Sequence, residues 1–551
     1  MSATTLTAPP PAGPMNHRRT LEALSGLLLA LFVAMLSSTV VSTALPKIIG
    51  ALNGSQTQYT WVVTATLLAA TATTPIWGKL ADLFSKKLLI QVSIVIYVAG
   101  SMVAGLSQSA GQLIAARTVQ GIGVGGLQAL VQVAIAAMIP PRERGRYNGY
   151  LGGVMALATV GGPLLGGLIV DSSWLGWRWC FYIGVPFAVV ALVLLQITLN
   201  LPVFRRENVK IDYLGAALIA AGVSLLLIWV SFVDSSFAWL SWPTAAMVVG
   251  SAILLALAVL VESRAAEPTV PLPILRERNT ALAILASLAV GMAMFGGAVF
   301  LGQYFQIGRG YSPTEAGLLT IPLMAGVLLA SIVAGRMVSA SGRIKPYIIV
   351  GATVLVAGFG MLAVVDHGTA LWYLGIGMFL IGVGVGMTMQ NLVLAVQNSV
   401  ALKDIGAASS TVAFFRSLGG TIGVSVLGAV LAHRVTAQIT HDLAAAGVPA
   451  SGGAPGGGTL NLTGLPEPIV HIIRAAYGDA TGHIFGISAV IAVVGIVAAV
   501  ALRPVMLRTS LDLPDEVTAA AVAADAVDGA PAFDQLGSAR TESEPAPEHR
   551  G

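Results

Sequence analysis

Cysteine and charged residues are scarce in this chain of 551 residues. The single cysteine, Cys180, excludes an internal disulfide and any metal site built from several cysteines. Only 10% of the residues are charged, against roughly 25% in soluble globular domains. Hydrophobic residues make up 56% of the chain, and the mean hydropathy is +0.84. This balance excludes an ordinary soluble protein and predicts a polytopic membrane protein.

Acidic residues are missing from the middle of every long apolar run. All 25 Asp and Glu residues fall in connecting segments, in the tails or at the ends of runs. Two cations, Arg117 and Arg416, are the only charges that we predict to lie deep in the membrane. Because a charge at the centre of a bilayer costs about 2.5–3.5 kcal/mol on insertion scales, an arginine there is expected to have a function.

Fourteen apolar runs are each long enough to cross roughly 30 Å of hydrocarbon. They lie at residues 22–44, 60–79, 88–106, 111–138, 147–170, 178–198, 213–233, 242–262, 281–304, 314–338, 346–364, 371–397, 407–433 and 480–503. If both termini are cytoplasmic, most of the 29 Lys and Arg residues fall on the cytoplasmic side. We therefore expect a multi-pass plasma-membrane protein with both termini in the cytoplasm.

An internal repeat divides the chain into two similar halves. The stretch that starts at Gly78 and contains Asp82 has a relative that starts at Gly335, 257 residues later, and the same offset carries Gly162 onto Gly419. Repeats packed around a midplane site are the architecture of alternating-access transporters. The repeat predicts a disordered cytoplasmic N-terminus (1–20), a six-helix bundle (21–200), two inserted helices (201–265), a second six-helix bundle (266–505) and a disordered acidic tail (506–551). Within the second bundle, residues 434–478 are expected to form a flexible external loop, with a short helix near 467–477.

Three motifs combine glycines with Asp82, with Arg117 or with Pro163. In the segment 78–87, Gly78 allows close helix packing and Asp82 can cap a helix or pair across the half-interface. In the run 111–138, Arg117 precedes several glycines that allow neighbouring helices to approach. Gln128 lies eleven residues after Arg117 and hence on almost the same face of a helix. In the run 147–170, Gly162-Pro163 predicts a kinked, tightly packed helix.

Together with the segment 36–46, these motifs resemble the fourteen-helix drug:proton antiporter family of the major facilitator superfamily over residues 20–503. The resemblance implies an all-α polytopic membrane protein with the major facilitator fold, two six-helix bundles plus two inserted helices. It implies a secondary active transporter that exports amphipathic drugs or antibiotics from the cytoplasm by alternating access in exchange for protons. The Gly162-Pro163 motif is similar to the one that marks exporters within the superfamily. No enzymatic activity, cofactor or metal site is expected.

The chain departs from this family at Ser37, where the pattern has a membrane-buried Asp. A lipophilic cation would meet the repulsion of Arg117 and Arg416 in a low dielectric. Neutral or anionic amphipathic substrates are therefore expected.

The resemblance also implies positions for function. For proton coupling and conformational change they are Arg117, Asp82, Gly78, Gly162 and Pro163. For substrate binding they are Ser38, Thr39, Gln128, Phe295, Gln303, Gln390, Asn391, Phe415 and Arg416. The expected partners are a small amphipathic molecule, protons and the lipid bilayer; nucleic acid is not expected, and the protein is expected to be monomeric.

Several alternatives for energy coupling stay open without a mid-membrane acid. A helix-end acid such as Asp82 or Asp171 could titrate while Arg117 or Arg416 changes partners. The membrane potential could instead drive export of an anionic metabolite, at about 2.3 kcal/mol per charge per 100 mV. An acid such as Asp171 or Asp479 could also face a water-filled cavity. A membrane sensor that uses the same fold without transport is a further alternative.

Overall fold

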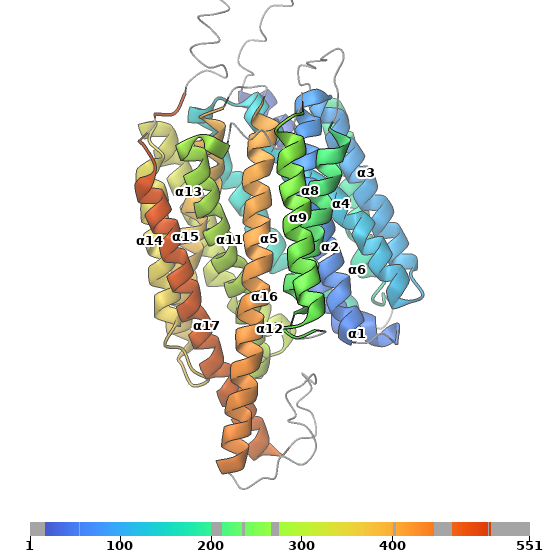
Figure 1. Cartoon of the computed structure of the whole chain (residues 1–551), viewed down its shortest axis with the longest axis vertical. Helices are drawn as coiled ribbons and strands as arrows, with labels where there is room; N and C mark the ends of the chain where they lie inside the picture. The colour runs from blue at the N-terminus through green and yellow to red at the C-terminus, as the bar shows by residue number, and fades with distance from the viewer. Residues whose placement is uncertain are drawn as a thin grey trace, which may run out of the picture.

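The structure, a computed structural model, describes residues 17–53, 56–172, 175–199, 212–233, 237–265, 275–400, 404–445, 466–504 and 506–508. Within these ranges it is a bundle of helices that run along a common direction (Figure 1). In the part of the chain that the structure describes, eleven helices are long and apolar enough to cross a membrane by length and composition. The predicted all-α polytopic membrane fold is confirmed, and every predicted apolar run coincides with one or two helices.

The first half of the chain supplies seven helices. They are α1 (His17–Ala51), α2 (Gln56–Leu83), α3 (Lys86–Leu106), α4 (Ala110–Met138), α5 (Pro141–Asp171), α6 (Trp179–Tyr182) and α7 (Gly184–Thr198). Helix α1 begins inside the segment 1–20 that was predicted to be disordered, and residues 1–16 lie outside the described residues. Glycines allow the close contact of α4 with α2: a Cβ on Gly121 would lie 2.5 Å from the carbonyl oxygen of Thr66.

The second half supplies a matching set. It consists of α11 (Arg278–Gln303), the π-turn η1 (Tyr304–Gly308), α12 (Pro313–Leu319), α13 (Ile321–Ser341), α14 (Lys345–Leu362), α15 (Leu371–Gln397), α16 (Ile405–Ala445) and α17 (Glu467–Ala501). The predicted run 314–338 is divided between α12 and α13, because Pro322 starts a new helix directly after Thr320.

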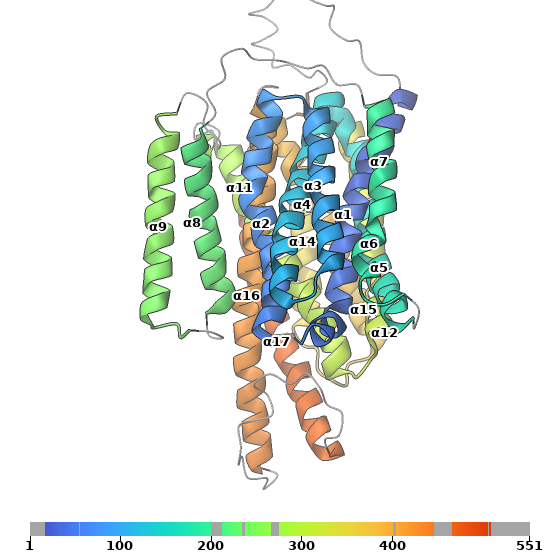
Figure 2. The same ribbon diagram turned by 90° about the vertical axis from the view of Figure 1, so that its right-hand side faces the viewer.

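Helices α8 (Tyr213–Phe232) and α9 (Trp242–Glu262) stand together at one edge of the bundle (Figure 2). Apolar side chains of α8, including Val223 and Leu227, pack against Phe414 and Leu418 of α16. This is the position of a pair inserted between two similar halves. The residue limits of the predicted domains stay a prediction.

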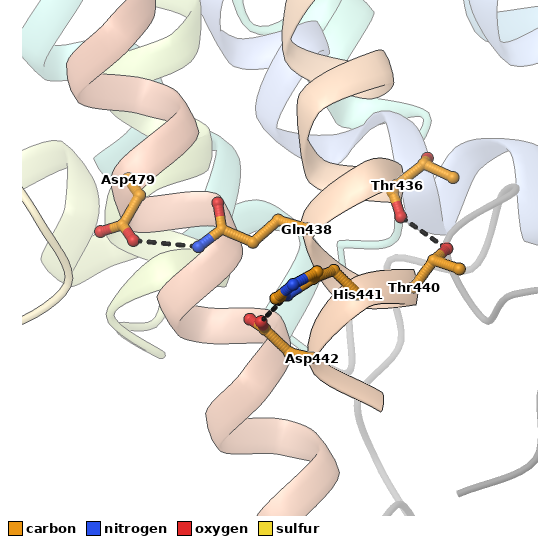
Figure 3. Close-up of polar contacts among 6 residues, drawn as sticks. All are labelled: Thr436, Gln438, Thr440, His441, Asp442 and Asp479. Carbon is orange, nitrogen blue, oxygen red and sulfur yellow. Dashed lines mark hydrogen bonds and ion pairs between the residues drawn. The ribbon is translucent and has the colours of Figure 1, made fainter. Parts of the chain in front are cut away.

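The segment 434–478 differs from the prediction of a flexible loop. Helix α16 continues to Ala445 and α17 begins at Glu467, so both helices extend beyond the others at one end (Figures 1 and 2). Apolar residues at helical spacing pack along this extension: Leu431, Val435, Ile439 and Leu443 of α16 with Ile473, Ala476 and Ala480 of α17. Gln438 also donates to Asp479 across the pair at 3.1 Å (Figure 3). The loop prediction is wrong for 434–445, whereas the short helix predicted near 467–477 is found as the first part of α17. Residues 446–465 lie outside the described residues.

The close approach of neighbouring helix backbones at glycine positions gives the first testable prediction. A Cβ on Gly382 of α15 would collide with the carbonyl oxygen of Leu323 in α13, whereas a Cβ on Gly360 of α14 would meet nothing within 4 Å. We expect Gly382→Ala to lower the thermal midpoint of the purified protein, at a cost of about 1–3 kcal/mol. Gly360→Ala is the matched control and should leave the midpoint unchanged or raise it. Equal midpoints for the two variants would contradict the packing described here.

Candidate functional site

A buried polar network surrounds Arg117 on α4. The side chain of Arg117 is 3% exposed. Its Nη1 donates to Oε1 of Gln120, and its Nε makes a long 3.5 Å contact with the carbonyl oxygen of Val62 in α2. Gln120 Nε2 donates in turn to Ser101 of α3 at 2.7 Å and to Ser37 of α1 at 3.3 Å. One guanidinium thus connects four helices through neutral acceptors.

Ser37 takes part in this network. The family that the sequence resembles has an Asp at this position. The hydroxyl of Ser37 accepts a hydrogen bond from the amide nitrogen of Gln120, and the amide oxygen of Gln120 accepts one from Arg117. The described contacts of Arg117 are all with neutral groups, so the network keeps a net positive charge. Within α4 the hydrogen bond of Arg117 goes to Gln120 rather than to Gln128, which was predicted to lie on almost the same face. Three residues along a helix bring side chains together, whereas eleven residues separate them by about 16 Å.

Asp82 joins the two halves of the molecule. It lies in the last turn of α2, beyond the apolar run 60–79, and it is half-buried. Its Oδ1 accepts the N–H of Gly406 at 2.8 Å and its Oδ2 accepts the N–H of Ala407 at 2.8 Å. These N–H groups belong to the first turn of α16, where unpaired donors and the helix dipole favour an anion. Gly78, one turn earlier, lets the backbones meet, since a Cβ there would collide with Ser410.

The environment of Asp82 changes its acidity. Burial raises the pKa of Asp82 to about 7, although the N–H groups of Ala407 and Gly406 and the charge of Lys86 act in the opposite direction. Asp404 adds a smaller increase by repulsion. The carboxyl group therefore changes charge within the physiological pH range. An exposed Asp has a pKa near 3.8. Between pH 3.8 and about 7, Asp82 is therefore protonated when it is in contact with α16 and ionised when it is exposed. The contact is favoured as the pH falls through about 7.

A second cluster crosses between the halves near Asp82. Arg144 of α5 is 2% exposed and donates to the carbonyl oxygens of Ile139 and Ala136, both at 2.6 Å, and to Gln397 of α15 at 2.8 Å. Gln397 donates to Ser409 of α16 at 2.8 Å. Arg144 is one of the Lys and Arg residues that the sequence predicts on the cytoplasmic side. Nothing in the sequence distinguished it from its neighbours Arg142 and Arg146.

Two further contacts extend this connection. Gln132 of α4 donates to Gln390 of α15 at 3.0 Å. On the other side, a Cβ on Gly152 of α5 would lie 2.6 Å from the hydroxyl of Ser331 in α13. We call these contacts between α1–α7 and α11–α17 the seam, and the end of the molecule that holds them the Asp82 end. In this structure the seam is closed.

The other predicted site residues are distributed more widely. Thr39 of α1 donates to the carbonyl oxygen of Ala158 in α5 at 3.0 Å, and a Cβ on Gly162 would collide with Thr39. Asn391 is buried but donates to Met387 of its own helix at 2.7 Å. The side chains of Ser38, Gln128, Gln303 and Phe415 are half-buried. The side chains of Phe295, Pro163 and Asp171 lie outside the described residues.

Arg416 differs from the other two buried arginines. Its side chain is 8% exposed, and Nη1 is buried without a hydrogen-bond partner among the described residues. Its backbone is fixed against α11, because Gly291 leaves no room for a Cβ beside the carbonyl oxygen of Arg416. The structure therefore places a cation in the interior and leaves one of its donors unused.

Comparison with known proteins agrees with this architecture. The sequence profile described as Major Facilitator Superfamily matches residues 27–424. The chain belongs to this superfamily. Its relatives include the multidrug transporter protein MdtP of Bacillus subtilis, 34% identical over 78% of this chain and 78% of that protein. The efflux pump dotC of Dothistroma septosporum is 33% identical over 83% of this chain and 79% of that protein.

A solved structure shows the same fold at low identity. The major facilitator proton:xylose symporter XylE superposes with a TM-score of 0.57 at 14% identity, covering 92% of this chain and all of that one. This likeness supports the fold alone. Membership of the superfamily makes the protein a multi-pass membrane transporter, and the prediction that it is not an enzyme is confirmed.

The raised pKa of Asp82 gives a testable pH dependence. Spin labels at Leu88 of α3 and Val350 of α14, both exposed, would report the separation of the two halves in a Cys180→Ser background. We expect the short-distance population to grow as the pH falls from 8 to 6, because protonation removes the cost of burying the carboxylate. Asp82→Asn should abolish this dependence. An equal dependence in Asp82→Asn would assign the titration to another group.

Proposed function

We propose that this protein is a secondary active efflux transporter that exports amphipathic drugs or antibiotics from the cytoplasm by alternating access. The observation that carries the proposal is the seam, which joins two similar halves at one end by contacts that can be broken and remade. The names of the relatives, a multidrug transporter and an efflux pump, support the direction of transport. The Gly162-Pro163 motif of α5 supports it as well.

In this proposal the Asp82 end faces the cytoplasm, as the distribution of Lys and Arg predicts. The structure then corresponds to the state closed toward the cytoplasm. Opening requires the loss of the Asp82 contacts with α16, the Arg144–Gln397 bond and the Gln132–Gln390 bond. Each group left behind is polar and can be solvated by water that enters from the cytoplasm. The protein would act as a monomer in the plasma membrane, with both termini cytoplasmic.

Proton exchange is the energy source that we propose. Ser37 removes the family's carboxylate from the interior, and the Arg117 network is built from neutral acceptors. Asp82 is then the group whose charge can change when the seam opens or closes. It would take up a proton that arrives from the opposite side of the membrane while the seam is closed, and release it to the cytoplasm when opening exposes the carboxyl group, so that one proton crosses in each cycle. Arg117 would keep α1, α2, α3 and α4 aligned during this change.

A second candidate is export of an anionic metabolite driven by the membrane potential. The neutral surroundings of Arg117 and Arg416 favour it, because a negatively charged substrate would neutralise the positive charge of the interior. Both candidates are exporters, and they differ in the gradient that they use.

Transport in inside-out vesicles separates the two candidates. The chain would be produced in an efflux-deficient bacterial host that is first screened for reduced drug susceptibility. We expect accumulation of a transported drug in the vesicles to fall when nigericin collapses the pH gradient and to persist in part when valinomycin collapses the potential, because exchange of a proton for a neutral or anionic drug also moves charge and is driven by both gradients. The reverse pattern would favour potential-driven export. Arg117→Gln, which loses the charged centre of the network, should reduce transport at least ~10-fold.

A further inference from the structure

The unpaired donor of Arg416 is the strongest unexplained feature of the interior. Among the buried arginines, Arg117 donates to Gln120, and Arg144 has three acceptors. Nη1 of Arg416 has none in the described part of the chain. A buried charge without hydrogen-bonded partners is strongly unfavourable. A position of this kind is therefore expected to meet a partner that comes from outside the chain.

The surroundings of Arg416 define what this partner can be. No carboxylate acts on its guanidinium among the described residues. The side chain of Arg416 is buried within the helix bundle, and Phe415, the preceding residue of α16, packs against the apolar core. A cation inside an apolar bundle matches a molecule with an anionic group and an apolar body.

We infer that the guanidinium of Arg416 recognises the anionic group, a carboxylate, sulfonate or sulfate, of an amphipathic substrate. The planar fork of arginine suits the two oxygens of such a group. This inference rests on the proposed exporter function and names its substrate class. It also gives a reason for the absence of an acid from the interior, because a carboxylate near Arg416 would compete with the substrate.

A matched pair of fluorescent probes tests the inference. 8-Anilinonaphthalene-1-sulfonate carries a sulfonate, and N-phenyl-1-naphthylamine has the same rings without it. Both would be titrated into the purified full chain in phosphatidylcholine nanodiscs, with empty nanodiscs subtracted. We expect Arg416→Gln to weaken binding of the sulfonate at least ~10-fold and that of the neutral probe by less than ~2-fold. Arg416→Lys, which keeps the charge but not the fork, should be intermediate.

The controls decide between recognition and packing. Arg336→Gln changes an exposed arginine on α13 and should affect neither probe. Equal weakening of both probes in Arg416→Gln, or unchanged sulfonate binding, would overturn the inference. Anionic phosphatidylglycerol distinguishes a lipid headgroup from a substrate: if it displaces the sulfonate in the wild type but not from Arg416→Gln, the occupant is lipid and the inference is overturned.

Export is measured separately from binding. If vesicles transport no compound but the difference between the probes persists, the exporter proposal fails and the anion site stands. If vesicles transport drugs while Arg416→Gln binds both probes as the wild type does, the exporter stands and the anion site is wrong.

An independent observation concerns the chain after α17. Residues 506–508, expected to belong to a disordered tail, lie across the seam instead. The N–H of Leu507 donates to Gly342 after α13 at 2.8 Å, and the carbonyl oxygen of Arg508 accepts the N–H of Arg142 in α5 at 3.1 Å. This short segment therefore touches both halves.

The end of α15 holds the same segment. Asn398 donates to the carbonyl oxygen of Met506 at 3.2 Å and accepts the N–H of Arg508 at 2.9 Å. The guanidinium of Arg508 donates to the carbonyl oxygens of Gln397 at 2.9 Å and Val400 at 3.0 Å. The segment thus satisfies acceptors at the end of a helix that would otherwise need water.

We propose that residues 506–508 form a strap that holds the seam closed and detaches when the Asp82 end opens. The contact with Arg142 makes the strap sensitive to the separation of α5 from α13 and α15. Among these bonds the one with Arg142 of α5 crosses between the halves and belongs to the closed state, so removal of the strap should shift the population toward the open state.

Two truncations test the strap with the spin labels at Leu88 and Val350. A chain that ends at Arg508 keeps the strap, whereas a chain that ends at Pro504 lacks it. We expect the first to give the distances of the full chain and the second to add a longer-distance population. Asn398→Ala should add a smaller fraction of the same population. The proposal is wrong if both truncations behave alike or if neither differs from the full chain.

Discussion

A guanidinium inside a membrane protein must find hydrogen-bond acceptors, and in this chain the acceptors come from neighbouring helices. Arg117 reaches acceptors that connect α1, α2, α3 and α4. Arg144 joins the end of α4 to α15. Each of these two cations thereby holds neighbouring helices together, because a buried guanidinium without acceptors is strongly unfavourable.

The acceptors are carbonyl and amide oxygens rather than carboxylates. A buried ion pair is difficult to separate, since each partner is left as an uncompensated charge. A bond from arginine to a neutral oxygen can be exchanged for one to water or to another carbonyl at smaller cost. The seam contains such a bond, from Arg144 to Gln397, together with the amide contact of Gln132 with Gln390 and the contact of Asp82 with the N-terminus of α16. In the proposed transport cycle these contacts would separate when the Asp82 end opens.

The sequence predicted the features that depend on a bilayer and on spacing. Apolar run length identified the helices, and the segment Gly78–Asp82 was expected to meet the other half, where the structure brings it to Gly406. The helical extension at 434–445 was missed because the glycine and polar residues that follow it dominated the composition, whereas the helix near 467–477 was predicted. The apolar spacing from Leu431 to Leu443 was the available signal. Gln120 stood three residues after Arg117 and could have been found from helical geometry.

Other features could not be read from the sequence. The start of α5 has an arginine at every second position: Arg142, Arg144 and Arg146. Only tertiary packing distinguishes Arg144 from the other two. The strap at 506–508 has no pattern of its own, because its contacts use backbone atoms at the ends of α13 and α15. The domain limits and the roles of the substrate-binding residues stay predictions.

Ser37 has the widest consequence of any single residue. An aspartate at this position would lie beside Gln120 and neutralise the network of Arg117, so that the interior would carry one negative and two positive groups. With serine, both cations keep their charge, and Asp82 at the rim is left to titrate. In the proposed mechanism the group that responds to protons is therefore separate from the group that meets the substrate. Coupling would then pass through movement of the helices that Arg117 holds together, rather than through competition for one carboxylate.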